Sequence, residues 1–127
     1  QVVITTSQRS SVESAKLYAA QTIESVFFLA GCDVEHSDGY PGWSPNPDSQ
    51  LLKTSVECYR NLFATEPKVR AIHAGLECGL FLEKYPHLEM VSFGPTLRGV
   101  HSPDERLEIS TVDKFWKLLV ELLKVLE

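Results

Sequence analysis

The residue of this sequence that is best suited to chemistry is a histidine in a turn-rich loop. His101 opens the run His-Ser-Pro-Asp-Glu, which follows the apolar segment 88–93 and a stretch rich in glycine and proline. A neutral imidazole on a rigid loop at the end of a strand is a good zinc ligand, and neighbouring carboxylates can orient its second nitrogen. An ordinary turn histidine before a Ser-Pro pair fits the same residues, so the spacing alone leaves both interpretations open.

An arginine in a polar segment is a second candidate, here for binding an anion. Arg9 lies in the middle of Ser-Gln-Arg-Ser-Ser at residues 7–11, between a β-branched run and a predicted helix. Free main-chain N–H groups favour anions at a helix start, and a guanidinium group binds a carboxylate through two hydrogen bonds. A capping segment with a solvated arginine explains this pattern equally well.

The run Ile-His-Ala-Gly-Leu-Glu-Cys-Gly at residues 72–79 is a third candidate. Gly75 would let the main chain approach a ligand closely, although a simple turn would also require it. Glu77 falls in the first turn of a predicted helix, where the macrodipole favours a carboxylate with or without a substrate. No Ser-His-Asp triad, carboxylate pair or His-Glu-x-x-His motif is recognisable in the sequence.

The elements that would position these residues alternate between strands and helices. Strands are expected at residues 2–6, 32–37, 69–72 and 88–93, and helices are expected from Ser10, from Pro47, at 76–85 and from Ser110. This alternation predicts an α/β fold with partly parallel strand pairing in the second part. A connector rich in proline and glycine near residues 40–47 predicts a domain boundary.

Capping residues and apolar spacing predict where the helices begin and which faces they bury. Ser10 with Glu13 has the spacing of a capping box, Asn46 precedes a proline at a first helical position, and Ser110 precedes the last helix. The predicted buried stripes are Val12, Ala15, Ala19, Ile23, Val26 and Ala30 in the first helix, Leu52, Val56, Tyr59 and Phe63 in the second, and Val112, Phe115, Leu119, Leu122 and Leu126 in the last.

Composition excludes several classes of protein. The 127 residues carry a net charge of -5 with scattered lysines and arginines, which argues against a nucleic-acid partner. No apolar run approaches the length of a membrane span, and no signal-peptide pattern is present. The 3 cysteines are widely spaced, as expected for reduced thiols in a soluble cytoplasmic protein. Because the sequence opens inside a strand-like run, we expect a fragment of a longer protein.

Three runs resemble the aminoacyl-histidine dipeptidase family of the M20 metallopeptidases. They are residues 5–11, 72–79 and 92–106, and the last reads Ser-Phe-Gly-Pro-Thr-Leu-Arg-Gly-Val-His-Ser-Pro-Asp-Glu-Arg. The resemblance covers essentially the whole chain and implies the C-terminal piece of such an enzyme. Residues 1–43 would be the second half of a lid and dimerisation domain, a β-α-β unit of a ferredoxin-like sandwich. Residues 44–127 would be the C-terminal part of the zinc-peptidase catalytic domain.

The resemblance also implies roles for the candidate residues. His101 matches the family's last zinc ligand, and Arg9 matches the lid arginine that binds the C-terminal carboxylate of the substrate. Gly75 matches a position whose main chain lies against bound substrate, and Glu77 is a further candidate for the pocket. The general base and the remaining metal ligands match nothing in this chain, so no catalytic residue is expected in it.

The implied activity is hydrolysis of dipeptides, including Xaa-His, by water activated between two zinc ions, with cobalt or manganese as alternative metals. The complete enzyme would act in the cytoplasm as a homodimer, whereas this chain alone would be inactive and could self-associate. A different interpretation also stays open, in which the chain is a standalone α/β module that binds a small anion or mediates dimerisation.

Overall fold

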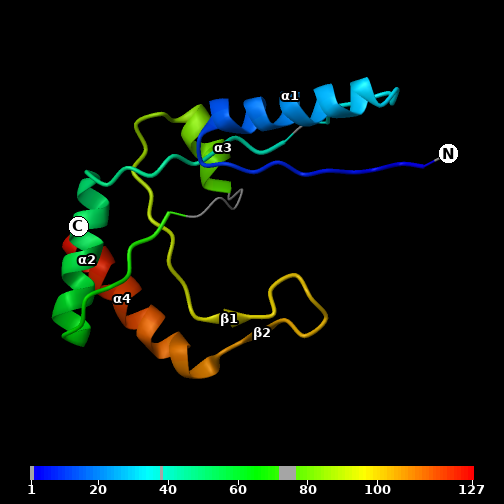
Figure 1. The fold of residues 1–127 in the computed structure, drawn as a ribbon. Coiled ribbons are helices and arrows are strands. Elements are labelled where there is room, and N and C mark those ends of the chain that lie inside the picture. The colour runs from blue at the N-terminus through cyan, green and yellow to red at the C-terminus, as the bar shows by residue number, and fades with distance from the viewer. Residues whose placement is uncertain (1, 38, 72–76) are drawn as a thin grey trace. The chain divides into compact units, whose positions relative to one another are not determined.

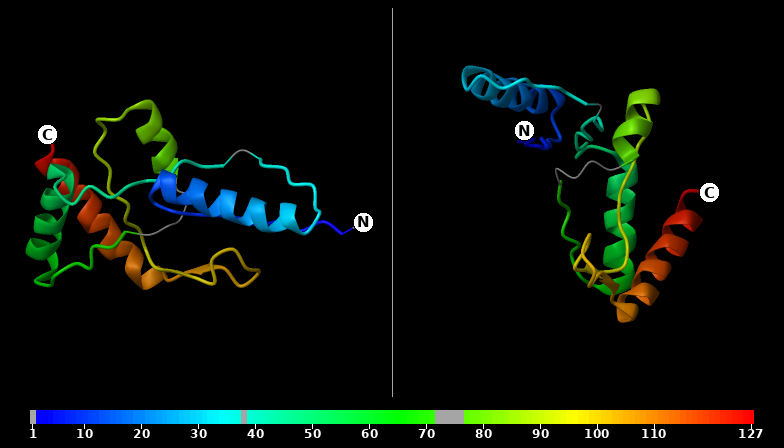
Figure 2. Two further views of the ribbon diagram at one scale, coloured as in Figure 1. Left: turned by 45° about the horizontal axis from the view of Figure 1, so that its top comes forward. Right: turned by 90° about the vertical axis from the view of Figure 1, so that its right-hand side faces the viewer.

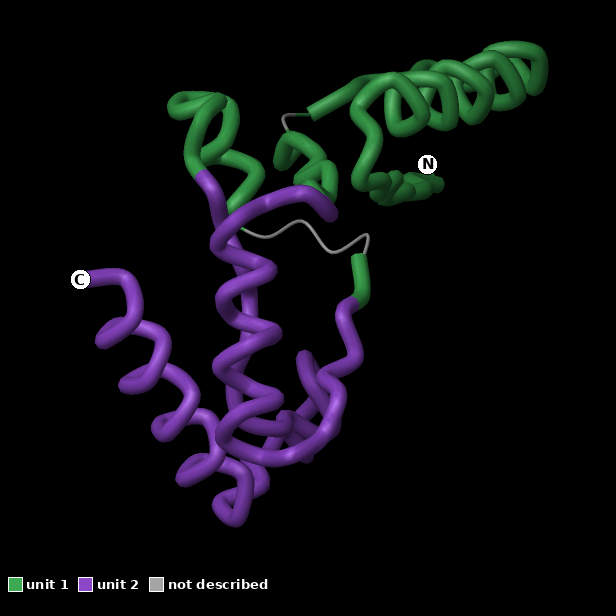
Figure 3. The backbone as a smooth tube through the Cα atoms, turned by 90° about the vertical axis from the view of Figure 1, so that its left-hand side faces the viewer, with its two compact units in different colours: residues 1–46, 70–88 green, residues 47–69, 89–127 purple. Residues whose placement is uncertain are grey.

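The computed structural model describes residues 2–37, 39–71 and 77–127, which fall into two compact units (Figure 3). Unit 1 comprises Gln1–Asn46 and Arg70–Leu88, and unit 2 comprises Pro47–Val69 and Glu89–Glu127. The elements in chain order are α1 (Glu13–Leu29), α2 (Gln50–Phe63), α3 (Glu77–Lys84), β1 (Leu97–Arg98), β2 (Arg106–Leu107), η1 (Ile109–Thr111) and α4 (Val112–Val125) (Figure 1). The described chain is therefore a helix-rich α/β structure.

Unit 2 is built on the packing of α2 against α4, which lie side by side in both views of Figure 2. Its buried core consists of Cys58, Leu118 and Leu122, and the partly buried Leu51, Tyr59, Phe63 and Phe93 pack around it. The sequence pattern correctly placed Leu122 in the core and Tyr59 and Phe63 around it. The buried residues of α2 are Ser55 and Cys58, which the predicted stripe omitted, and Val112 and Leu126 of the predicted α4 stripe are exposed. Burial raises the pKa of the Cys58 thiol, which keeps it neutral in this core.

The start of α2 differs from the prediction because its free N–H groups find a distant partner. The Ser49 hydroxyl accepts a hydrogen bond from the Leu52 N–H at 3.2 Å. The Glu89 carboxylate accepts hydrogen bonds from Gln50 and Leu51, at 2.9 and 3.0 Å. The predicted cap at Asn46, with Pro47 in the first turn, is therefore wrong, and the helix begins at Gln50.

Helix α1 of unit 1 also begins differently from the prediction. The Ser10 hydroxyl accepts a hydrogen bond from Val12 N–H, and the carboxylate of Glu13 turns outward to Lys16 Nζ at 2.7 Å and to the N–H of Gly42 at 3.0 Å. The predicted capping box is therefore wrong, because Glu13 binds the connector and not the main chain of Ser10. The hydrogen bond from Lys16, followed by that from Gly42, lowers the pKa of Glu13.

The connector is held against the start of α1 along several residues. Lys16 Nζ donates to the Tyr40 carbonyl at 2.8 Å, and the Ser44 hydroxyl donates to the carbonyl of Ser11 at 2.8 Å. None of the residues of α1 is buried, so its predicted stripe is wrong for the described chain. Among the described residues, no helix is long and apolar enough to cross a membrane.

None of the four expected strands forms a ladder in the described residues. The pairing present there is the antiparallel ladder of β1 and β2, not a parallel one. Residues 2–6, 32–37, 69–71 and 88–93 form no ladder, and Ile72 lies outside the described residues. A β-branched run becomes a strand only beside a partner strand that takes its main-chain hydrogen bonds, and composition does not supply that partner.

Candidate metal-ligand hairpin

His101 lies in a tight hairpin of unit 2. Strands β1 and β2 pair with Leu97 opposite Leu107 and Arg98 opposite Arg106, so residues 99–105 form the connecting loop (Figure 1). The ladder thus consists of one leucine pair and one arginine pair. Hydrogen bonds between residues of the loop itself then hold residues 99–105.

The first half of this loop is closed by a serine. The Ser102 hydroxyl donates to the Gly99 carbonyl at 2.6 Å, and the Ser102 N–H donates to the same oxygen at 3.1 Å. Gly99 has φ of 60°, and a Cβ there would meet Ser102 Oγ and the Asp104 carbonyl oxygen, each at 3.1 Å. A glycine is therefore required at this turn for both conformation and space.

His101 itself has a left-handed main-chain conformation, with φ of 63°. A non-glycine residue in this region costs on the order of 1–3 kcal/mol and persists where its surroundings impose the conformation. The N–H of His101 donates to Glu105 Oε2 at 2.9 Å, so a carboxylate of the same loop holds it. The side chain is exposed and lies on the surface of unit 2.

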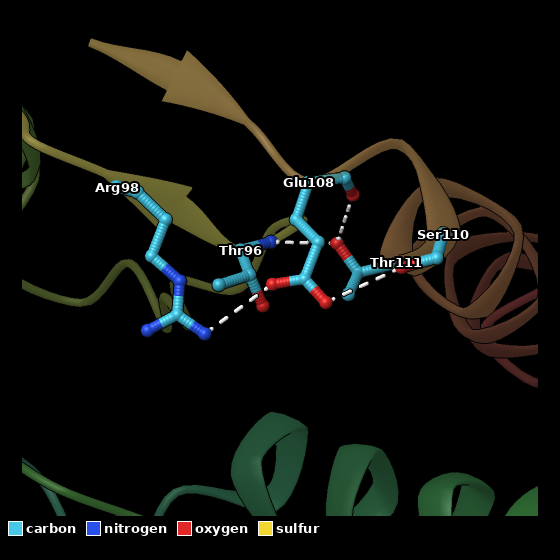
Figure 4. Close-up of polar contacts among 5 residues, drawn as sticks. All are labelled: Thr96, Arg98, Glu108, Ser110 and Thr111. Atoms are coloured by element: carbon cyan, nitrogen blue, oxygen red, sulfur yellow. Dashed lines mark hydrogen bonds and ion pairs between the residues drawn. The ribbon is translucent and has the colours of Figure 1, made fainter. Parts of the chain in front are cut away.

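The base of the hairpin is tied to the start of α4 (Figure 4). The N–H of Thr96 donates to the Thr111 hydroxyl at 2.8 Å, and that hydroxyl donates to the carbonyl of Glu108 at 2.7 Å. The Glu108 N–H returns to the Thr96 carbonyl at 2.9 Å, and the Glu108 carboxylate meets Arg98 Nη2 at 3.3 Å. The two ends of the hairpin that carries His101 are therefore joined to Thr111, the residue that precedes α4.

These contacts also correct the predicted cap of the last helix. Ser110 is the middle residue of η1, and its hydroxyl donates to the Glu108 carboxylate at 3.3 Å rather than capping α4. The helix begins at Val112, after Thr111, whose hydroxyl serves the base of the hairpin. A local capping pattern could not show that the hairpin would take this hydroxyl.

The other predicted site residues belong to unit 1. Arg9 is exposed, in the segment that precedes α1, and Glu77 is the exposed first residue of α3. Gly75 lies outside the described residues. His101 belongs to unit 2, so the structure describes each candidate within its own unit.

The metal donors among the described residues provide a single candidate ligand and no complete site. Within the described ranges, no group of three or more His, Cys, Asp or Glu side chains could hold a metal ion together. A zinc site in a protein takes three or four protein ligands. His101 is exposed on a hydrogen-bonded loop and is suited to contribute one nitrogen, so the other ligands of such a site would come from outside these ranges.

Sequence reasoning missed the contact that Glu105 makes. It expected nearby carboxylates to orient the second ring nitrogen of His101, whereas the Glu105 hydrogen bond goes to the main-chain N–H. The available signal was a glutamate four residues after the histidine, in a loop that begins with a glycine turn. That signal becomes specific only when the register of β1 and β2 is known.

The comparisons with known proteins define the class of this chain. Residues 2–125 match Peptidase family M20/M25/M40, so the chain belongs to this peptidase family. It is 47% identical over 116 residues to the cytosol non-specific dipeptidase of Escherichia coli (strain K12), covering 91% of this chain and 24% of that protein. The family resemblance inferred from the three sequence runs is thereby confirmed.

A solved structure gives the same relationship. The chain superposes on the aminoacylhistidine dipeptidase of Vibrio alginolyticus with a TM-score of 0.72 and 44% sequence identity, covering 91% of this chain and 24% of that one. The chain thus spans about a quarter of the length of the relatives that it matches.

Proposed function

We propose that this chain is part of a metal-dependent dipeptidase that hydrolyses dipeptides, including Xaa-His, in the cytoplasm. The observation that carries the proposal is the 47% identity to a cytosol non-specific dipeptidase along 116 residues, a stretch that includes most of the described structure. The hydrogen-bonded hairpin supports it, because a histidine whose main chain is held in this loop is suited to ligate a metal.

In this proposal each candidate residue has one task. His101 holds a metal through an imidazole nitrogen, and Arg9 binds the C-terminal carboxylate of the substrate through a guanidinium group, whose paired N–H donors match two oxygens. The main chain at Gly75 would lie against the substrate, and Glu77 is a further candidate for the pocket. Arg9 would thereby set the length of peptide that can reach the metal.

The metal would be a pair of zinc ions, with cobalt or manganese as alternatives, and would activate a water for attack on the peptide bond. This chain would supply one ligand and no general base. We therefore propose that it is inactive alone and that the complete protein, as a homodimer, is active. Residues 1–43 would be part of the lid, and residues 44–127 part of the catalytic domain.

An alternative is a standalone module that binds a small anion or mediates dimerisation. Arg9 before a helix start would suit an anion, but Glu13 already brings a carboxylate to the first turn of α1. Exposed apolar side chains of α1, such as Phe28 at 75%, would suit association of this chain with itself.

The test is hydrolysis of a Xaa-His dipeptide by the complete protein, stripped of metal and then restored with zinc. His101→Ala should abolish most of the zinc-dependent activity, by about 100-fold or more, because a ligand is lost. His87→Ala, which removes a histidine from unit 1, is the matched control and should keep full activity. The 127-residue chain assayed alone with zinc should show none.

Full activity of the His101→Ala protein would remove the ligand role from His101. Hydrolysis by the isolated chain would show that it holds a complete site. No hydrolysis by the complete protein with or without zinc, together with binding of a small anion that is lost in Arg9→Ala, would support the standalone module instead.

A further inference from the structure

The main chain of His101 is held in a conformation that residues with a Cβ disfavour. Its φ of 63° lies in the left-handed region, which histidine adopts less rarely than bulkier residues but still seldom. The direction of the Cα–Cβ bond follows the main-chain angles. A return of His101 to an ordinary negative φ would therefore swing its imidazole to a different direction from the hairpin.

One side chain in the hairpin holds this conformation by direct contact. Glu105 Oε2 accepts the N–H of His101 at 2.9 Å. Glu105 is itself fixed, because its N–H donates to the Ser102 carbonyl at 3.1 Å and the next residue, Arg106, is paired in the ladder with Arg98. The carboxylate thus folds back across the loop from the last position before β2.

We propose that Glu105 is the positioning residue of the His101 site. Its carboxylate holds His101 in the left-handed conformation and so sets the direction of the imidazole before a metal binds. This inference rests on the proposed role of His101 as a metal ligand. Glu105 uses neither ring nitrogen of the histidine, which separates it from carboxylates that orient a ligand histidine through its ring.

The adjacent carboxylate provides a matched comparison. Asp104 takes part in the loop through its main chain: its N–H donates to Ser102 Oγ at 3.3 Å, and its carbonyl accepts from Arg106 Nη1 at 3.1 Å. Its side chain carries the same charge in the same loop. Replacing Asp104 removes that charge and leaves the hydrogen bond to His101 in place.

The experiment uses the complete protein with Glu105→Ala, Glu105→Gln, Asp104→Ala and His101→Ala. Zinc affinity is measured by chelator competition, ligand geometry by the visible absorption of the cobalt-substituted protein, and kcat and KM with a Xaa-His dipeptide. Glu105→Ala should weaken zinc binding about 10- to 100-fold, as loss of a supporting contact does at other metal sites. It should also shift the cobalt bands and lower kcat more than it changes KM.

The conservative variant separates positioning from charge. Glu105→Gln keeps an oxygen that can accept the His101 N–H, so its zinc affinity should stay within about fivefold of the original and its cobalt bands should return. Asp104→Ala should behave as the unchanged protein. In the metal-free protein, amide hydrogen exchange at His101 should be faster in Glu105→Ala and near normal in Glu105→Gln, which is a readout independent of activity.

Three results would overturn the inference. They are an unchanged zinc affinity and cobalt spectrum in Glu105→Ala, a Glu105→Gln variant as defective as Glu105→Ala, or an equal defect in Asp104→Ala. His101→Ala separates the ligand role of His101 from the positioning role of Glu105. If it releases zinc while Glu105→Ala does not, only the positioning role fails; if it keeps zinc, the ligand role of His101 fails as well.

Discussion

The two units of this chain bury their helices to very different extents. In unit 2, α2 and α4 each carry one apolar face and enclose Cys58, Leu118 and Leu122 between them. In unit 1, α1 is the longest helix described, yet none of its residues is buried, and Tyr18 and Leu29 are 73% and 86% exposed.

This difference follows from how apolar residues are arranged along the helices. The apolar residues of α2 and α4 lie on one side, so a single contact covers them. Those of α1, among them Leu17, Tyr18 and Leu29, are spread around the helix, which is typical of a helix surrounded by other structure. Unit 2 therefore has a core of its own, whereas α1 leaves its apolar side chains unburied among the described residues.

The largest expected effect comes from truncating the core of unit 2. Leu122 is only 4% exposed, and Leu122→Ala should lower the free energy of unfolding of unit 2 by about 3 kcal/mol through lost burial and the cavity left behind. Leu17→Ala in α1, where Leu17 is 54% exposed, should change the free energy of unfolding of unit 1 by less than about 0.5 kcal/mol.

The two tryptophans allow this comparison to be measured in each unit. Trp116 belongs to unit 2 and Trp43 to unit 1, so urea unfolding followed by fluorescence in Trp43→Phe or Trp116→Phe backgrounds reports one unit at a time. Equal losses from Leu122→Ala and Leu17→Ala would show that α1 is packed as well as α4, contrary to the comparison.

The second effect concerns the close contact between α3 and the connector in unit 1. Gly79 is buried in α3, and a Cβ there would clash with the Pro41 carbonyl oxygen. Gly79→Ala should destabilise unit 1 by about 1–3 kcal/mol, because the main chain must move, although alanine ordinarily favours a helix. The measurement is the urea midpoint of Trp43 fluorescence.

A glycine in the connector gives the control for this substitution. A Cβ on Gly39 would meet no atom within 4 Å, so Gly39→Ala should leave the Trp43 midpoint unchanged. A stabilised Gly79→Ala protein would mean that α3 and the connector are not in contact, and unit 1 would then be less ordered than described.

The same contrast explains what the sequence could predict. Apolar spacing located α1, α2 and α4, because helical hydrogen bonds are local and the pattern reports them directly, and the helix expected at residues 76–85 corresponds to α3. It misplaced the starts of α1 and α2, because Gly42 and Glu89, 29 and 39 residues away from their partners, bind the groups concerned. Contacts at that separation leave no local signal.

Strands and the site were predictable to different degrees. The run His-Ser-Pro-Asp-Glu was enough to single out His101, whose loop the structure then shows to be held tightly. The hydrogen bond from the His101 N–H to Glu105 was not predictable, because it depends on the pairing of Arg98 with Arg106. Residues 2–6 have the composition of a strand, but a ladder requires a second segment, and none of the described residues provides one.

A third, smaller effect tests the base of the hairpin. Thr111→Val keeps the shape of the side chain but leaves the N–H of Thr96 without its acceptor, which should cost unit 2 about 1–2 kcal/mol. Ser110→Ala removes only a hydroxyl bound to an exposed carboxylate and should cost less than about 0.5 kcal/mol. The measurement is the Trp116 unfolding midpoint, and equal effects at both positions would show that the hairpin is not anchored through Thr111.

The smallest expected effect is a difference in acid sensitivity between the two units. Hydrogen bonds from the N–H groups of Leu51 and Gln50 hold the pKa of Glu89 in unit 2 below its ordinary value of 4.5. A lowered pKa in the folded state stabilises the fold above about pH 4.5, and this contribution is lost as the pH falls through the folded-state pKa. Glu89→Gln should therefore flatten the acid dependence of the Trp116 midpoint.

Glu13 allows the equivalent experiment in unit 1. The pKa of Glu13 is lowered in the same direction, first by Lys16 and then by the N–H of Gly42, so Glu13→Gln should flatten the acid dependence of the Trp43 midpoint alone. If Glu89→Gln or Glu13→Gln flattened the acid dependence of both tryptophan midpoints, the two units would unfold in one transition. The contrast between a unit 2 with its own core and an α1 without buried residues would then fail.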